Sequence, residues 1–267
     1  MNLTAQQLKQ FDEEGYLFFP NYFSTDEIAL MKREIPGIFA QRRQENVREK
    51  SGDVVRTAFA VHTYNPVFEA LVHHPRFVTP AEQLLGDRTY IHQFKINGKA
   101  AFDGDVWQWH QDYGTWKADD DMPEARAMNL AVFLDDVNEF NGPLWFIPKS
   151  HKKGAIDASH DLTTTSYPLW VIDNDTIAKL VAQGGIVAPK GPPGSAIFFH
   201  GTLVHGSPPN MSPWDRQIIY VTYNAVSNAI RRFKRPAHIA HRDFTPLGIW
   251  GEDCLVKAAS APRQAAE

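Results

Sequence analysis

The sequence predicts a mainly β protein with flanking helices, a β-sandwich or jelly roll braced by helices. Two observations predict this class. The first third of the chain carries helix-capping patterns followed by apolar residues at helical spacing, whereas many short strand-like runs separated by turns follow from Thr89 onward. With 267 residues, the chain is long enough to bury a sizeable core.

Three helix starts are expected in the first third of the chain. Each combines a capping side chain or a first-turn proline with a following apolar periodicity. Gly86 is expected to end the third helix, because glycine adopts the left-handed conformation of a C-cap without strain. The starts are Thr4, for a helix to Glu14; Ser24 with Glu27, for a helix with apolar residues to Phe39; and Thr79-Pro80-Ala81-Glu82, with Pro80 as its first residue.

Seven strands are expected after residue 89, with a turn at Asn141-Gly142-Pro143 between two of them. A further helix is expected over residues 173–183, ended by Gly184-Gly185. The expected strands are residues 90–97, 106–112, 127–134, 144–147, 195–199, 202–205 and 217–223.

Composition excludes several classes of protein. Lys and Arg number 27 against 31 Asp and Glu, and the net charge of −4 gives no support to nucleic acid or an anionic membrane as a partner. The one cysteine, Cys254, excludes a disulfide framework and favours a cytoplasmic location. No apolar run has membrane-span length, and the N-terminus lacks the apolar stretch of a signal peptide.

We therefore expect one domain over residues 1–267, with the helical N-terminal third packed on the jelly roll. The stretch 257–267 is small and polar, and it is expected to fray.

A candidate metal site begins with His110 and Asp112 in the segment Trp107 to Asp112. Residues two apart on a strand point to the same face, so the two side chains could hold one ion. His205 ends a later strand-like run, and two imidazoles with one carboxylate make the facial triad of non-haem iron(II) oxygenases, which leaves positions open for substrates. A polar strand edge with a satisfied histidine is the alternative for His-x-Asp taken alone.

Arg216 follows His205 after a turn-rich loop, residues 208–213. The strands on either side are expected to pair as a hairpin and to bring Arg216 beside the metal. A guanidinium binds a carboxylate through two parallel hydrogen bonds, which suits the distal carboxylate of 2-oxoglutarate. A surface charge at the start of a strand is the alternative.

Together these residues resemble the phytanoyl-CoA dioxygenase superfamily of iron(II)/2-oxoglutarate oxygenases. The resemblance spans roughly residues 3–228 and rests on residues 90–97, 107–116, 141–151, 205–207 and 221–224. Within the superfamily it is strongest to bacterial hydroxylases of free amino acids, such as ectoine hydroxylase, proline trans-4-hydroxylase and leucine 5-hydroxylase. His200 and Lys149 depart from the pattern, where relatives often carry Asp and Gly. We leave His200 out of the metal site and interpret His151 as structural.

The resemblance implies a double-stranded β-helix, a cupin-like jelly roll with the metal at one mouth. It implies His110, Asp112 and His205 as metal ligands and Arg216 as the anchor of 2-oxoglutarate. The cofactors implied are Fe(II), 2-oxoglutarate as cosubstrate and O2, with ascorbate as an in vitro stimulant. Further polar contacts to the cosubstrate are implied for Gln93, Asn97, Asn129 and Ser207.

The implied activity is that of a 2-oxoglutarate-dependent non-haem iron dioxygenase, a hydroxylase. The expected substrate is a small free L-amino or imino acid of the proline, pipecolic acid or leucine type, hydroxylated at an unactivated C–H with release of succinate and CO2. Asp112 argues against halogenation, because related halogenases have a small residue at the carboxylate position.

Five residues are candidates for the substrate side of the pocket. Tyr113, Trp116 and Trp170 offer rings for an aliphatic body, and Arg56 and Lys95 offer cations for a carboxylate. The acidic run 119–121 is expected to be a solvated loop, with a lid as the alternative.

Two other functions are weighed against the amino acid hydroxylase. The same chemistry could act on a larger natural-product or acyl substrate, but the length of the chain leaves little for a carrier-docking domain. A non-catalytic jelly-roll binding protein is the alternative of another class, and the triad together with Arg216 counts against it. The sequence leaves open the amino acid, the carbon, the stereochemistry and the oligomeric state.

Overall fold

Helices α1 and α2 begin where their capping residues predict. The computed structural model describes residues 2–261. In α1 (Ala5–Glu14) the Thr4 hydroxyl accepts from the Gln7 N–H while the Gln7 side chain accepts from the Thr4 N–H. Ser24 and Glu27 make the same reciprocal pair at the start of α2 (Thr25–Ala40). Both capping boxes satisfy N–H groups that the first helical turn leaves without partners, and both predictions are confirmed.

Helix α4 (Pro75–Leu85) begins earlier than predicted. It follows α3 (Pro66–Val72), and its N-cap is His74, with Pro75 in the first turn. The predicted first residue, Pro80, lies inside the helix instead. Proline in the first turn loses no intrahelical hydrogen bond, so both prolines fit a start signal and the sequence alone does not separate them. Gly86 ends the helix at a φ of 63°, as predicted.

The remaining helices are α5 (Asp112–Asp120), α6 (Asn174–Gly184) and α7 (Cys254–Ser260), with 3-10 turns at Val61–Thr63, Ser150–Lys153 and Val226–Asn228. Helix α6 confirms the helix expected at 173–183. Helix α7 covers the first residues of the stretch expected to fray, whereas residues 262–267 lie outside the described part. Within residues 2–261, no helix combines the length and apolar character that crossing a membrane requires.

The major sheet is antiparallel throughout and has seven strands in the order β1-β10-β6-β12-β4-β3-β2. The strands predicted at 90–97, 127–134, 195–199 and 217–223 coincide with four of them, to within a few residues at each end. The seven are β1 (Tyr16–Phe19), β10 (Ala196–His200), β6 (Ala127–Phe133), β12 (Arg216–Ala225), β4 (Thr89–Lys99), β3 (Val55–Phe59) and β2 (Asn46–Arg48).

A smaller sheet of three strands, in the order β5-β11-β7, faces the inner side of the major sheet. Its strands are β5 (Trp107–His110), β11 (His205–Ser207) and β7 (Trp145–Phe146), and β8 (Ser159–Asp161) pairs with β9 (Leu169–Val171) beside it. The hairpin expected between residues 202–205 and Arg216 is wrong. Strand β11 pairs with β5 and β7, whereas β12 pairs with β4 and β6, so the loop between them carries the chain from one sheet to the other.

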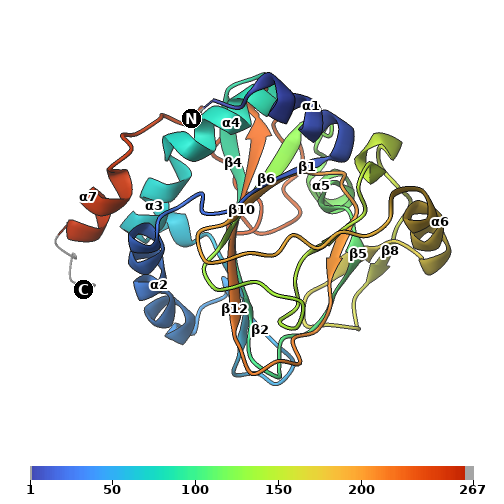
Figure 1. Ribbon diagram of the computed structural model, residues 1–267, viewed down its shortest axis with the longest axis horizontal. Coiled ribbons are helices and arrows are strands. Elements are labelled where there is room, and N and C mark those ends of the chain that lie inside the picture. The colour runs from blue at the N-terminus through green and yellow to red at the C-terminus, as the bar shows by residue number, and fades with distance from the viewer. Residues whose placement is uncertain (1, 262–267) are drawn as a thin grey trace.

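The two faces of the major sheet are buried against different layers. On β6, Leu130 and Val132 belong to the core formed with α2, α3, α4 and α7, whereas Ala131 and Phe133 belong to the core shared with β7. This alternation is the period of two that a strand imposes. Figure 1 shows the result: α2, α3, α4 and α7 cover one side of the sheet, while β5, β8 and α6 lie on the other.

Candidate active site

His110 and His205 face each other across the smaller sheet. His110 is the last residue of β5 and His205 the first of β11, and the two are direct partners in the strand pairing, with ring centroids 4.1 Å apart. Asp112 is the first residue of α5 rather than part of a strand. The strand-parity argument for His110 and Asp112 is therefore wrong. The chain turns into a helix after Gln111, and that turn brings the carboxylate to the two imidazoles.

The three side chains form a compact cluster of possible metal ligands. The Asp112 carboxylate lies 3.7 Å from the His110 Nε2 and 3.6 Å from the His205 Nε2, and all three residues are buried. One ligand atom from each lies within 4.8 Å of the others, and no other such group of three occurs among residues 2–261. Two nitrogens and one carboxylate oxygen on one side of a point leave the opposite positions free for other ligands.

Backbone carbonyl groups orient both imidazoles. The His110 Nδ1 lies 2.6 Å from the Gln108 carbonyl oxygen, and the His205 Nδ1 lies 2.9 Å from the Leu203 carbonyl oxygen. A carbonyl only accepts, so each Nδ1 carries the proton and donates. Each Nε2 then presents its lone pair to the cluster, as metal-binding histidines require.

The protonation states of the cluster suit a divalent cation. Burial and the neighbouring His205 lower the pKa of His110 to about 3, and burial lowers the pKa of His205, so both rings are neutral near pH 7. Burial alone would raise the pKa of Asp112, but Lys95, the two histidines and a hydrogen bond from Asn129 lower it to about 2. Neutral imidazoles and an ionised carboxylate are the forms that bind metal, and this mixed N/O set fits Fe(II).

A cavity opens beside the triad and receives side chains from both sheets. Its apolar walls come from Trp107, Leu144 and Phe199, and β4 and β12 contribute polar side chains. The triad aside, it is lined by Lys95, Asn97, Trp107, Leu144, Phe199, Gly206, Ser207, Arg216 and Tyr220.

Arg216 supplies a buried cation with free donors to this cavity. Its side chain is 1% exposed, and neither Nε nor Nη1 has a hydrogen-bond partner. Burial lowers the pKa of Arg216, whereas Tyr220 and Asp135 favour its charged form. Unpaired N–H groups of a buried guanidinium are costly, and a ligand carboxylate in the cavity would give them an acceptor. The residues present therefore fit a dicarboxylate bound between the triad and Arg216.

Two of the four further contacts predicted for 2-oxoglutarate line the cavity. Asn97 and Ser207 do, whereas Gln93 and Asn129 are not among the lining residues. The Gln93 side chain donates to the Ile239 carbonyl oxygen over 3.0 Å. Asn129 donates to the Asp112 Oδ2 over 2.7 Å, so it lies behind the carboxylate rather than in front of it.

Of the residues predicted for the substrate side, Lys95 lines the cavity and the rings after the triad do not. Trp116 is 1% exposed and packs with Tyr113 in a separate buried cluster that includes Met122 and Ile230. Helix α5 explains the difference, because a helix turns these rings away from the direction in which a continued strand would point them.

Arg56 and Trp170 are also engaged elsewhere. The Arg56 guanidinium pairs with Glu49 at 3.1 Å and lies 3.9 Å from the centre of the Trp107 ring. Trp170 stacks on His160 with ring centroids 4.8 Å apart. Neither lines the cavity at the triad. Arg56 instead supports Trp107, which does.

The acidic run 119–121 is not a solvated loop. Asp119 and Asp120 end helix α5, and Asp120 is fully buried, paired with Arg235 and 3.3 Å from the His92 Nε2. Asp119 pairs with Lys234 nearer the surface. Both cations come from the strand-free segment after Asn228, and no local pattern predicts that this segment lies against the helix.

His200 and His151 lie apart from the triad. The His200 Nδ1 is 2.7 Å from the Thr202 hydroxyl, and His151 bonds to the Asp12 carbonyl oxygen over 2.9 Å. Both histidines thus hold α1 and the loops beside it.

Tyr220 is a cavity residue that sequence reasoning missed. It lines the cavity together with Arg216, and its ring centroid lies 5.3 Å from the Lys95 Nζ. Strand parity could have found it, because Arg216 and Tyr220 are four apart on β12 and so share a face. Lys95 and Asn97 on β4 share a face for the same reason.

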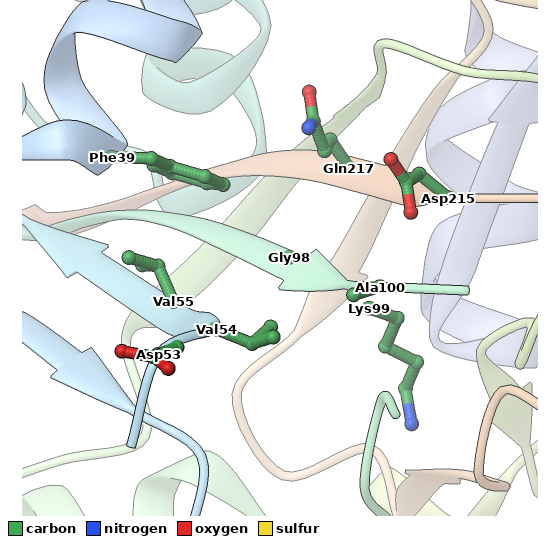
Figure 2. A pocket seen from close by; sticks show the side chains of 9 residues that line it. All are labelled: Phe39, Asp53, Val54, Val55, Gly98, Lys99, Ala100, Asp215 and Gln217. Atoms are coloured by element: carbon green, nitrogen blue, oxygen red, sulfur yellow. The ribbon is translucent and has the colours of Figure 1, made fainter. Parts of the chain in front are cut away.

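A second hollow lies at the C-terminal end of β4 (Figure 2). Phe39, Val54 and Val55 form its apolar wall, and Asp53 and Asp215 lie on its rim. Figure 2 shows the Lys99 side chain leaving β4 away from Phe39. The Lys99 Nζ donates to the Asp105 and Pro208 carbonyl oxygens. Without histidine, this hollow has no ligand set comparable to the triad.

The family model of phytanoyl-CoA dioxygenase (PhyH) matches residues 11–218 of the chain. Ectoine dioxygenase from Bordetella bronchiseptica is 35% identical over 257 residues, which cover 90% of this chain and 83% of that protein. L-proline trans-4-hydroxylase from Streptomyces griseoviridis is 34% identical over 248 residues, covering 89% of this chain and 92% of that protein.

The fold is similar to crystal structures of EctD from S. alaskensis. The structure with 2-oxoglutarate and 5-hydroxyectoine has a TM-score of 0.81 at 35% identity and covers 90% of this chain and 84% of that one. The structure with bound Fe has a TM-score of 0.83 at 34% identity, covering 93% and 87%. These similarities confirm the predicted jelly-roll oxygenase fold and its dependence on iron and 2-oxoglutarate.

Proposed function

Because the chain belongs to the phytanoyl-CoA dioxygenase family and is a 2-oxoglutarate-dependent non-haem iron dioxygenase, we propose that it hydroxylates a small free L-amino or imino acid. The substrate is of the proline, pipecolic acid or leucine type, and an unactivated C–H bond is the point of attack. Bound iron supplies the oxidising chemistry, in which 2-oxoglutarate is converted to succinate and CO2. The protein binds and orients both organic molecules and excludes water.

In this proposal His110, Asp112 and His205 are the iron ligands, and Arg216 binds the distal carboxylate of 2-oxoglutarate. The support is the buried N/O cluster and the unpartnered Nε and Nη1 of Arg216. Asn97 and Ser207 line the same cavity and offer further polar atoms to the cosubstrate.

The position of Lys95 is the main support for the proposed substrate class. It is a second cation in the cavity, 14% exposed, with its Nζ 4.0 Å from the Asp112 Oδ1. The Lys95 ammonium can therefore pair with an anionic group of a bound substrate. A buried charge without a partner is costly, so the cavity favours a substrate with one carboxylate.

The rest of the cavity suits a short aliphatic body. Trp107, Leu144 and Phe199 supply apolar walls, and Tyr220 lies between the two cations. A pocket with apolar walls and a few placed charges fixes the orientation of a zwitterion and thereby the carbon that is attacked.

Ectoine, a small cyclic zwitterion, is the second candidate substrate. It is favoured by the 35% identity to ectoine dioxygenase and by the likeness to a structure holding 5-hydroxyectoine. The similar identity to a proline hydroxylase keeps the imino acids as the first candidates.

A substrate panel tests the proposed function. Purified protein with Fe(II), ascorbate and 2-oxoglutarate is offered L-proline, L-pipecolate, L-leucine and ectoine, and in parallel peptides, carrier-bound acyl groups and coenzyme A thioesters. Succinate and product mass are measured. We expect substrate-stimulated succinate and a gain of one oxygen on at least one free amino or imino acid, with His110→Ala as the inactive control. Oxygen gain confined to peptides, carrier-bound acyl groups or coenzyme A thioesters would contradict the substrate class.

Lys95→Met tests the carboxylate contact itself. We expect the apparent affinity for the amino acid to fall about 10- to 150-fold, the equivalent of roughly 1.5–3 kcal/mol for a lost charged hydrogen bond, with a smaller change for 2-oxoglutarate. Pyrrolidine, which is proline without its carboxylate, should bind the wild type and the variant alike. Removing the substrate carboxylate and removing the Lys95 ammonium each delete the same interaction, so the second change has no further effect. A loss confined to 2-oxoglutarate would assign Lys95 to the cosubstrate instead.

A further inference from the structure

Nothing in helix α5 holds the side chain of its first residue, Asp112. The N-cap residue, Gln111, makes no side-chain capping bond, and its amide donates instead to the Gly154 and Thr202 carbonyl oxygens. A carboxylate on the first turn of a helix could rotate freely about its side-chain bonds. The group that fixes Asp112 must therefore come from outside the helix.

That group lies on the major sheet. The Asn129 Nδ2 donates to the Asp112 Oδ2 over 2.7 Å, and the Thr222 hydroxyl donates to the Asn129 Oδ1 over 2.6 Å. Asn129 on β6 and Thr222 on β12 are direct partners in the strand pairing, and both are 0% exposed. The chain of hydrogen bonds thus runs from one sheet across the interior to the carboxylate.

The direction of this chain follows from what each group can do. An ionised carboxylate only accepts, so the amide must turn its NH2 end toward Asp112. Its oxygen then faces Thr222, and the threonine hydroxyl must donate. Each donor is buried and has one acceptor at short distance, which leaves the amide a single satisfied orientation.

We propose that Thr222 and Asn129 are positioning residues for the iron site, holding the Asp112 carboxylate in its ligating orientation. Asn129 occupies a lone pair of Oδ2, while the nearest cation to Oδ1 is the Lys95 ammonium at 4.0 Å. The two residues act through Asp112 and touch neither iron nor substrate. This assignment replaces the contact to 2-oxoglutarate that the family resemblance implied for Asn129.

The same sheet contains a matched pair that lacks the contact to the triad. The Thr57 hydroxyl donates to the Asn97 Oδ1 over 3.0 Å, and these two are also direct cross-strand partners, on β3 and β4. Asn97 hydrogen-bonds to none of the three triad side chains. Removing the Thr57 hydroxyl therefore deletes an equivalent bond without reaching Asp112.

The test is the affinity for Fe(II), measured without oxygen and without 2-oxoglutarate by competition with a chelator. Asn129→Leu should weaken iron binding roughly 10- to 100-fold, the range for the loss of a group that orients a metal ligand. Thr222→Val, which keeps the shape and removes the donor, should weaken it less but in the same direction. Thr57→Val should leave the iron affinity at the wild-type value.

Coordination geometry gives a second measurement that is independent of turnover. Substituting Co(II) for iron, we expect the visible absorption bands of the Asn129→Leu complex to differ from those of the wild type, and those of Thr57→Val to coincide with them. If Thr222→Val and Asn129→Leu bind iron within twofold of wild type and keep its cobalt spectrum, the proposal is overturned. Should Asn129→Leu fail to fold, Thr222→Val alone decides. The substrate panel has no bearing on this result.

Discussion

At the scale of single residues, two backbone carbonyl groups set the state of the candidate metal site. The carbonyl groups of Gln108 and Leu203 fix the tautomers of His110 and His205, and burial keeps both rings neutral. The site is thereby prepared to bind metal without first losing protons near pH 7.

Replacing either imidazole should abolish activity while the fold survives. His110→Ala and His205→Ala each remove one of three ligand atoms, whereas the core of the sandwich lies in clusters that exclude both residues. Turnover, iron content and the circular dichroism spectrum are the measurements. Near-wild-type turnover with iron in either variant would show that the triad is assigned wrongly.

Arg216→Ala should mainly weaken 2-oxoglutarate. The loss of a charged hydrogen-bond partner in a buried site costs roughly 1.5–3 kcal/mol, or about 10- to 150-fold in affinity. Arg216→Lys should recover only part of it, because an ammonium lacks the paired donors of a guanidinium. Titration of 2-oxoglutarate into the iron-loaded variants measures the effect, and an unchanged affinity for Arg216→Ala would remove Arg216 from this role.

At the scale of elements, helix α5 joins the candidate metal site to the segment after Asn228. Asp112 begins the helix, and Asp120, at its other end, is buried with Arg235. Removing one partner of a buried ion pair leaves an uncompensated charge and typically costs about 3–5 kcal/mol. The pair therefore fixes the C-terminal end of α5, opposite the end that carries the candidate ligand.

Arg235→Met should accordingly lower the free energy of unfolding by about 3–5 kcal/mol in urea denaturation. The matched control is Lys234→Met, because Lys234 pairs with Asp119 but its side chain is 59% exposed. An exposed pair of this kind contributes about 1 kcal/mol or less. If both variants lose the same free energy of unfolding, burial does not determine how much the Arg235–Asp120 pair stabilises the fold.

How far the sequence predicts this fold depends on how local each feature is. The capping boxes at Thr4 and Ser24, the stop at Gly86 and the long strands β4, β6 and β12 depend on neighbouring residues and were predicted. Strand pairing is not local, so the hairpin between His205 and Arg216 was predicted where the chain instead passes between sheets.

The residues of the candidate site also differ in how far local sequence patterns predict them. Residue types and spacing indicated the triad and Arg216, whereas Asn97 and Ser207 were implied only by the family resemblance. The role of Asn129 depends on a strand that lies beside another strand distant in sequence, and Trp116 was misplaced because the turn into α5 could not be seen. Long-range packing decides such positions, and one sequence gives no record of it.

At the scale of the whole molecule, buried imidazoles make stability depend on pH. Burial lowers the pKa of His74, His200 and His241 from the usual 6.5 to about 4, and that of His62 well below its usual value. The unfolded chain takes up these protons near pH 6.5 and the folded chain only near pH 4. The stabilisation is therefore fully present above pH 6.5 and is lost as the pH falls toward 4.

Urea denaturation at pH 7.5 and pH 5.0 should show this loss. Each histidine whose pKa is about 4 contributes at most about 2 kcal/mol between these two values. The His241 ring packs 4.7 Å from that of His62. His241→Asn should reduce the difference in unfolding free energy between the two pH values by the contribution of one histidine. If the variant and the wild type lose the same free energy over this range, His241 does not titrate as its burial implies.

His205 lies on the smaller sheet and Arg216 on the larger one. This arrangement also has a consequence for thermal stability. In the proposed site, a 2-oxoglutarate molecule held beside His205 and paired with Arg216 would contact both sheets of the sandwich. Unfolding would then separate the two sheets and release the bound 2-oxoglutarate. Mass action adds RT ln(1 + [L]/Kd) to the free energy of unfolding, where [L] is the concentration of free 2-oxoglutarate. In the presence of iron, the melting temperature should climb with the logarithm of cosubstrate concentration, and in Arg216→Ala that climb should begin only at higher concentrations.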